Sequence, residues 1–187
     1  MSEEMIIRNC APTLAGIKTG SMFSCPFTSS EELKSSVRLW NKRLISKGIR
    51  VIPLKFSGKS ALIYIYRPIK LKKDLQDKKA CKILSRCGYK KCSADQSLAR
   101  LIKRMAKGAD FPHEIGLFLG YPPEDVKGFM ENKSKNCLFV GYWKVYGNEQ
   151  KAKKIFAKYR LCTDNFTERY FSGETVERLT AAVGIKN

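Results

Sequence analysis

Apolar residues recur at helical spacing in several stretches of the chain, most clearly between Ser29 and Gly48. Leucine, valine and tryptophan side chains follow one another there at intervals of three and four residues, as on the buried face of an amphipathic helix. Ser29 with Glu32 three residues later is the capping-box pattern that begins a helix, and Gly48 can end it. Similar spacing predicts further helices over 69–88, from Ser93 to Gly108, from Pro112 to Leu119, after Pro122, after Asn148 and from Val176 to about Gly184.

Strand-like runs occupy three other stretches. Residues 49–56 and 61–66 are rich in β-branched and aromatic side chains, and the short polar segment between them predicts a hairpin. Pro53 places the first of these strands at a sheet edge, because proline cannot donate a ladder hydrogen bond. In 137–146, apolar side chains occupy both alternating sets of positions, as in a strand that is buried on both faces.

These elements predict an α+β fold in a single domain that spans residues 1–187. We expect a small sheet of about three to four strands, with the hairpin over 49–66 and a central strand over 137–146. About six to seven helices surround this sheet. A chain of 187 residues, of which 43% are hydrophobic, can bury such a core without disulfide support.

The composition also indicates the cellular compartment of the protein. Seven cysteines are an odd number, and none of them forms a C-x-x-C pair, which indicates reduced thiols rather than a disulfide framework. No apolar run reaches the roughly 18 residues of a spanning helix. The opening residues 1–5 are acidic, where a signal peptide would be basic. We therefore expect a cytoplasmic protein without a membrane partner.

The formal net charge of +19 is concentrated in one part of the sequence. Between Lys34 and Lys107 there are 22 lysine and arginine residues against three acids, so this basic segment carries the whole net charge. Such a surface would bind the phosphates of nucleic acid without regard to base sequence, which is an alternative function for the protein. A solvated lysine-rich face explains the same pattern. The candidate contacts for a nucleic acid are Lys42, Arg43, Arg100, Lys103, Arg104 and Lys107.

Residues 111–129, with the sequence FPHEIGLFLGYPPEDVKGF, hold the only histidine of the chain and three of its seven prolines. His113 followed by Glu114 matches the start of the zinc-protease motif H-E-x-x-H, but Leu117 stands where the second histidine is required. That interpretation is excluded. The dispersed cysteines lack the spacing of a zinc site, so we assign no metal.

Three motifs together resemble one known family. They are CAPTLAGIKTGSMF over 10–23, the 111–129 segment, and GYWKVY over 141–146, in this order and near these distances. In them the chain is similar to domain-of-unknown-function family 3793, found in anaerobic Gram-positive bacteria, over nearly its whole length. The resemblance implies that the residues around Cys10 and around His113 belong together, and it supplies no activity.

We therefore expect a small-molecule or anion-binding site between the 10–21 loop and the 111–129 segment, with a Cys/His enzyme as its most specific form. His113 would act as acid or base and Cys10 or Cys25 could be the thiol, with Cys10 preferred, although Glu114 is poorly placed to orient its neighbour on a helix. The glycine-rich loop would cradle an anion with main-chain N–H groups. The ligand contacts are Thr13, Lys18, Thr19, Ser21, Glu114 and Tyr121. The alternative is a histidine bonded to nearby backbone and a buried Cys10. The sequence predicts no particular cofactor or oligomeric state.

Overall fold

The computed structural model describes residues 1–90, 93–107 and 111–182. Helices and two small antiparallel sheets make up this part of the chain, which confirms the predicted α+β class. The chain divides into two compact units. Unit 1 comprises Met1–Ile69 with Leu161–Asn187, and unit 2 comprises Lys70–Arg160. The expectation of a single domain stays a prediction.

Unit 1 is built on a three-stranded antiparallel sheet. Its strands are β1 (Gly20–Pro26), β2 (Arg50–Ser57) and β3 (Ser60–Tyr66), and β3 lies in the middle. β2 and β3 form the predicted hairpin. Pro53 lies on the edge strand β2, as expected, and the register of the pairing shifts between Pro53 and Lys55.

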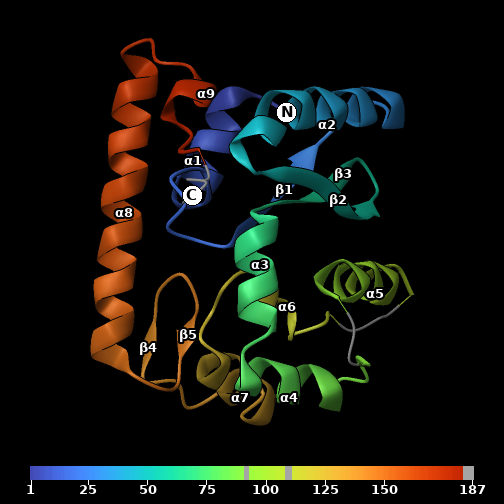
Figure 1. Ribbon diagram of the computed structural model, residues 1–187, viewed down its shortest axis with the longest axis vertical. Coiled ribbons are helices and arrows are strands. Elements are labelled where there is room, and N and C mark those ends of the chain that lie inside the picture. Colours follow the sequence, from blue (N-terminus) through green and yellow to red (C-terminus); the bar gives the residue numbers. More distant parts are fainter. Residues whose placement is uncertain (91–92, 108–110, 183–187) are drawn as a thin grey trace, which may run out of the picture. The chain divides into compact units, whose positions relative to one another are not determined.

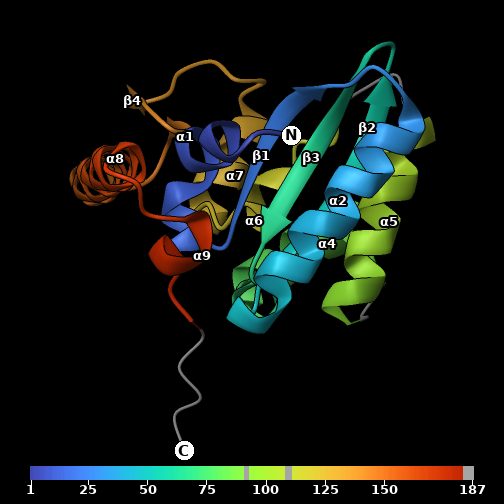
Figure 2. The same ribbon diagram turned by 90° about the horizontal axis from the view of Figure 1, so that it is seen from above.

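Helices α1 (Glu3–Leu14) and α2 (Ser30–Leu44) share the hydrophobic core of unit 1 with this sheet (Figure 1). Figure 2 shows α2 lying along the sheet. Every second side chain of β3, at 61, 63 and 65, faces this core. The hydroxyl of Ser29 accepts a hydrogen bond of 3.1 Å from the N–H of Glu32, so the predicted start of α2 is confirmed. The short helices η1 (Ile45–Lys47) and α9 (Val176–Leu179) complete the unit.

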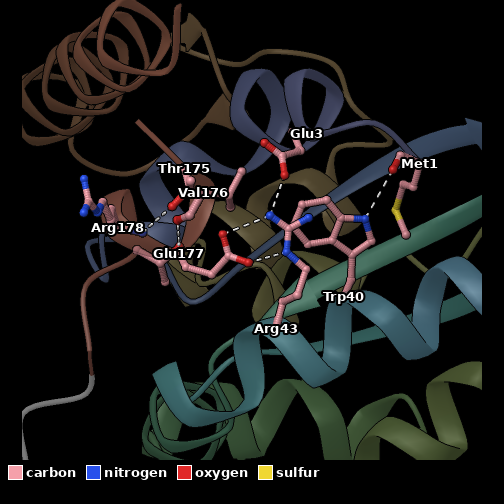
Figure 3. A network of polar contacts seen from close by, with 9 residues as sticks. Met1, Glu3, Trp40, Arg43, Thr175, Val176, Glu177 and Arg178 are labelled. Carbon is pink, nitrogen blue, oxygen red and sulfur yellow. Dashed lines mark hydrogen bonds and ion pairs between the residues drawn. The ribbon is translucent and has the colours of Figure 1, made fainter. Parts of the chain in front are cut away.

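Arg43 on α2 joins three helices of unit 1 (Figure 3). Its guanidinium donates hydrogen bonds to Glu3 on α1 and to Glu177 on α9, and it lies 4.2 Å from the centroid of the Trp40 ring. The Trp40 indole N–H donates in turn to the carbonyl of Met1 at 3.2 Å. The hydrogen bond from Arg43 lowers the pKa of Glu177. This cation is therefore part of the fold.

Unit 2 consists mainly of helices. In chain order its elements are α3 (Pro68–Leu75), α4 (Lys78–Arg86), α5 (Ala94–Lys107), α6 (Ile115–Phe118), α7 (Pro123–Glu131), β4 (Phe139–Val140), β5 (Lys144–Val145) and α8 (Glu149–Phe171). α8 continues from unit 2 into unit 1. Among the helices of the described residues, none combines the length and the apolarity needed to cross a membrane.

The helix boundaries follow local capping. The predicted helical stretch over 69–88 contains two helices, because the Asp77 carboxylate caps the second by accepting hydrogen bonds from the N–H groups of Lys79 and Ala80. The Ser93 hydroxyl accepts from the N–H of Gln96 at 3.2 Å, as the prediction for α5 requires. The predicted helix ends at Gly108 and Gly184 lie outside the described residues.

The prediction of a central strand over 137–146 is wrong. These residues form a hairpin in which β4 pairs only with β5, and Phe139 lies opposite Val145. Trp143 and Val145 are buried, whereas Leu138 and Val140 are 56% and 60% exposed. The apolar residues on both alternations therefore reflect a hairpin with one buried side and one exposed apolar side.

The prediction of a loop starting at Cys10 is also wrong, because residues 10–14 are the last part of α1. Ile6, Cys10 and Leu14 are fully buried and recur every four residues, so they keep the helix on the core despite Pro12. Only residues 15–19 connect α1 to β1.

Candidate functional site

The predicted thiol Cys10 and three of the predicted ligand contacts, Thr13, Lys18 and Ser21, gather in a buried polar cluster of unit 1. The hydroxyls of Thr13 and Ser21 lie 2.9 Å apart, and Ser21 also hydrogen-bonds Cys10. Cys10 is fully buried, and this burial raises the pKa of its thiol to about 12, against the opposing effects of Lys18 and Ser21. The thiol is therefore protonated at neutral pH.

Lys18 lies in the same buried cluster, with 8% of its surface exposed. Burial lowers the pKa of its ammonium group to about 8, and the neighbouring Cys10 opposes this shift. Thr19, the next predicted contact, is also buried, with 6% exposed. The sequence prediction thus found residues that the fold brings together in unit 1.

The main-chain cradle predicted for this loop is wrong. Four successive N–H groups, from Ala15 to Lys18, donate to carbonyls of α1: those of Ala11, Thr13 and, for the last two, Pro12. These hydrogen bonds satisfy the last carbonyl groups of α1. The carbonyl oxygens point out of this end of the helix, which is the negative end of the helix dipole. The N–H groups of residues 15–18 are therefore engaged within the fold.

Arg67 closes the same helix end. Its buried guanidinium donates to the carbonyl of Thr13 at 2.7 Å and to that of Leu14 at 2.6 Å. It also donates to the carbonyls of Ala181 at 2.8 Å and Lys47 at 3.2 Å. The polar groups around the 15–19 connection are thus paired with one another as part of the packed interior.

In unit 2, His113 and Glu114 point to different environments, as expected for neighbours near a helix start. The ring of His113 is exposed and contacts that of Phe129 edge-on, with 5.0 Å between the centroids. Glu114 is 2% exposed and forms an ion pair with Arg104, at 3.0 Å from Nε. It also accepts a 3.0 Å hydrogen bond from the Tyr89 hydroxyl. Glu114 therefore holds α5 and Tyr89 in place.

A hollow of about 400 Å³ lies in unit 2, where two of the three family-like motifs meet. From 111–129 come Leu117, Gly120 and the run Tyr121 to Glu124, and from GYWKVY comes Trp143. The remaining lining residues are Asp74, Asp77, Lys79, Lys151, Ile155 and Tyr159. Of the predicted site residues, Tyr121 lines this hollow.

The wall of the hollow is fixed by a buried carboxylate. The rings of Tyr121 and Trp143 stack with their centroids 4.7 Å apart. The indole N–H of Trp143 donates to Asp125 at 2.7 Å, and the N–H groups of Tyr146 and Gly147 donate to the other carboxylate oxygen at 2.8 Å each. Asp125 was not among the predicted site residues; its place inside the 111–129 motif, beside the two prolines, was the available signal.

Charges of both signs surround the hollow. Asp77 is committed to capping α4, and Lys79 lies 3.9 Å from Glu124. Burial raises the pKa of Tyr121 and of Tyr159 to about 12 each, so both phenols are protonated at neutral pH and can donate. The Tyr121 hydroxyl donates to the carbonyl of Tyr142 at 3.3 Å. The hollow therefore offers carboxylates and ammonium groups beside aromatic walls.

The predicted nucleic-acid contacts fall into two groups. Arg43 and Arg104 are engaged in ion pairs, with Glu3 and Glu177 and with Glu114 respectively. The other four are exposed on helices: Lys42, Arg100, Lys103 and Lys107. Binding of a polyanion by the basic segment stays a prediction.

Metal ligation has no support among the described residues, where no three His, Cys, Asp or Glu side chains gather in a suitable arrangement. Cys92 lies outside the described residues. The two halves of the predicted composite site belong to different units, Cys10 to unit 1 and His113 to unit 2. A joint site between them stays a prediction.

Comparison with known proteins gives one match. Residues 6–180 match the family model described as "Protein of unknown function (DUF3793)". No curated protein and no solved structure matches the chain. The match covers nearly the whole sequence and includes all three motifs that first indicated the resemblance. The chain therefore belongs to the DUF3793 family.

Proposed function

We propose that this protein binds a small polar molecule in the hollow of unit 2. The observation that carries the proposal is that two motifs, separated in sequence, supply the walls of one hollow: Tyr121 to Glu124 from one and Trp143 from the other. Its volume of about 400 Å³ lies within the range of small-molecule sites. The run from Tyr121 to Glu124 belongs to the 111–129 segment, which the sequence predicted to be part of a ligand site.

The lining defines the kind of ligand. Aromatic walls at Tyr121, Trp143 and Tyr159 suit a flat or apolar part of the ligand. The lining holds both carboxylates and ammonium groups, such as Glu124 and Lys151, which suit a molecule that carries both an amino and an acidic group. A small zwitterion fits these features better than a purely apolar ligand does.

The proposal is one of binding, and it assigns no reaction. A protonated, fully buried thiol at Cys10 is a poor nucleophile, because the thiolate is the reactive form. The exposed ring of His113 contacts aromatic side chains and is not among the residues that line the hollow. The Cys/His enzyme is therefore not part of the proposal.

A thermal-shift screen of amino acids, amino dicarboxylates and other small zwitterions tests this function. A true ligand at about a hundred times its Kd stabilises the folded protein by about 2.7 kcal/mol, which raises Tm by roughly 5–10 °C for a chain of this size. Glu124→Gln and Lys151→Gln should each abolish most of that rise. Lys154→Gln removes a charge from the same helix outside the lining and should leave the rise unchanged.

The same screen separates the hollow from the composite site. His113→Ala should keep the ligand-induced rise in Tm, since His113 does not line the hollow. A ligand whose effect disappears in His113→Ala and persists in Lys151→Gln would overturn the proposal in favour of the composite site. A screen in which no zwitterion shifts Tm would also count against it.

A further inference from the structure

A second hollow in unit 2, of about 440 Å³, lies between the β4–β5 hairpin and α8. Figure 1 shows the hairpin beside the first part of α8. Its lining residues are Phe139, Val140, Gly141, Tyr142, Lys153, Phe156, Ala157 and Arg160. We call it the hairpin groove. It shares no lining residue with the first hollow, and none of the predicted site residues lines it.

The floor of the hairpin groove is aromatic. Phe156 lies 6.0 Å from Phe139 and 5.5 Å from Tyr142, measured between ring centroids. Gly141 permits this packing, because a Cβ there would lie 2.3 Å from the Phe156 ring. Tyr142 is 42% exposed. An open aromatic surface of this kind can stack against a flat ligand.

The rim of the groove is cationic. Lys153 and Arg160 lie seven residues apart on α8, which places them about 10 Å apart along the helix. None of the lining residues is acidic, although Glu149 next to the groove pairs with Lys153 at 2.7 Å. The sequence around the groove, residues 132–160, contains eight basic residues and one acidic residue, a net charge of +7. This charge favours an anionic occupant that extends beyond the groove.

The hairpin groove is distinct from the first hollow. Lys151, Ile155 and Tyr159 line the first hollow and recur every four residues along one face of α8. Lys153, Phe156 and Arg160 line the groove from another face. Variants of Lys153 or Arg160 therefore change the groove lining and keep every residue that lines the first hollow.

We propose that the hairpin groove binds single-stranded nucleic acid. Unpaired bases would stack on the exposed ring of Tyr142, and backbone phosphates would contact Arg160 and Lys153. A solvent-open aromatic ring beside cations is the combination that such a strand requires. An acidic peptide would satisfy the charge but not the stacking surface. The inference rests neither on the small-ligand site nor on the basic segment over 34–107.

Fluorescence anisotropy with labelled oligo(dT) and oligo(U) of about a dozen nucleotides tests the stacking part. Wild-type protein should bind both at low salt, and a duplex of the same length should bind more weakly because its bases are paired. Tyr142→Leu should weaken single-strand binding by about tenfold, the loss of one stacked base. Tyr142→Phe keeps the ring and should keep the affinity, which controls for damage to the hairpin.

The electrostatic part has its own matched variants. Arg160→Gln should weaken binding and reduce the slope of log K against log salt by about 0.7, the value for one phosphate contact on a single strand. Lys154→Gln, on α8 outside the groove lining, should change affinity by less than about twofold, as expected for a charge without a phosphate contact. Lys103→Gln on α5 should behave like Lys154→Gln.

Three results would overturn the proposal. Equal affinity for duplex and single strands, with no effect of Tyr142→Leu, would show attraction by charge alone. Loss of binding in Lys103→Gln but not in Arg160→Gln would place the contact on the basic segment. Binding of an acidic peptide with leucine anchors, without any binding of oligonucleotide, would identify a different class of partner.

Discussion

The buried polar cluster of unit 1 and the first hollow of unit 2 differ in what their polar groups do. Both contain residues from the family-like motifs, with glycine and proline near titratable side chains. In unit 1, Cys10 is fully buried and the hydroxyls of Thr13 and Ser21 bond each other. In unit 2, Tyr121 and Glu124 border a hollow of about 400 Å³. One motif supports the interior, and the other shapes a cavity.

Glycine beside polar residues indicates an unusual backbone and does not by itself indicate a ligand site. Gly16 follows α1 with φ of 77°, and Gly120 follows α6 with φ of 76°. Both positions use the left-handed conformation to leave a helix. The sequence signal is the same, and only the surroundings of each turn decide whether space for a ligand exists.

The largest expected effect comes from Arg67→Met in unit 1. The variant would remove the charged donor from the carbonyls of Thr13, Leu14 and Ala181, although the N–H groups of Gly16 and Ala181 still donate to the first two. We expect a loss of about 4 kcal/mol in the free energy of unfolding, on the basis of about 1.5–3 kcal/mol for each hydrogen bond to a charged donor. Urea unfolding measures it. Arg50→Met, an exposed arginine of β2, is the matched control and should cost less than about 0.5 kcal/mol.

An Arg67→Met protein as stable as Arg50→Met would show that the carbonyls at the end of α1 are not part of a closed interior. The contrast between the two regions would then lose its main support.

An effect of intermediate size is expected on the pH dependence of the free energy of unfolding, through Lys18. The folded protein releases the Lys18 proton near pH 8, whereas the unfolded chain holds it until about pH 10.5. Because the unfolded state then binds more protons, stability should rise between about pH 8 and pH 9, by on the order of 1 kcal/mol. Above pH 9 the raised pKa of Cys10, about 12, has the opposite sign, since the folded state keeps a proton that the unfolded state loses.

Urea unfolding at pH 7.5, 8.5 and 9, run in parallel on wild type and Lys18→Met, measures this effect. The variant should lack the rise. Identical pH profiles for the two proteins would mean that Lys18 is solvated and that the cluster of unit 1 is open.

The smallest expected effect is at the edge of the first hollow. Lys151 is exposed, so Lys151→Gln should change the free energy of unfolding by less than about 0.5 kcal/mol while it removes ligand binding. Urea unfolding without ligand measures the stability of the variant, and the thermal-shift screen measures its ligand binding. A large loss of stability in the absence of ligand would make Lys151 a structural residue like those of unit 1.

Local features of the fold were predictable from the sequence. The cap at Ser29, the hairpin with Pro53 on its edge strand and the start of α5 each depend on residues within a few positions of one another. The prediction of a central strand over 137–146 was wrong because a hairpin with one exposed apolar side has apolar residues at the same positions as a strand buried on both faces. The prediction of a loop starting at Cys10 was wrong because burial of Cys10 and Leu14 in the core stabilises the helix although Pro12 lies within it.

The sequence by itself determined the family, the α+β class and the two regions where titratable residues gather. The tertiary structure decided what those regions are, because the deciding hydrogen bonds join residues far apart in the chain. Arg67 reaches Thr13 across 54 positions and closes the end of α1, and Trp143 reaches Asp125 across 18 and holds the hairpin beside the hollow. A buried polar group is costly unless such a partner arrives, and no local pattern shows whether it does.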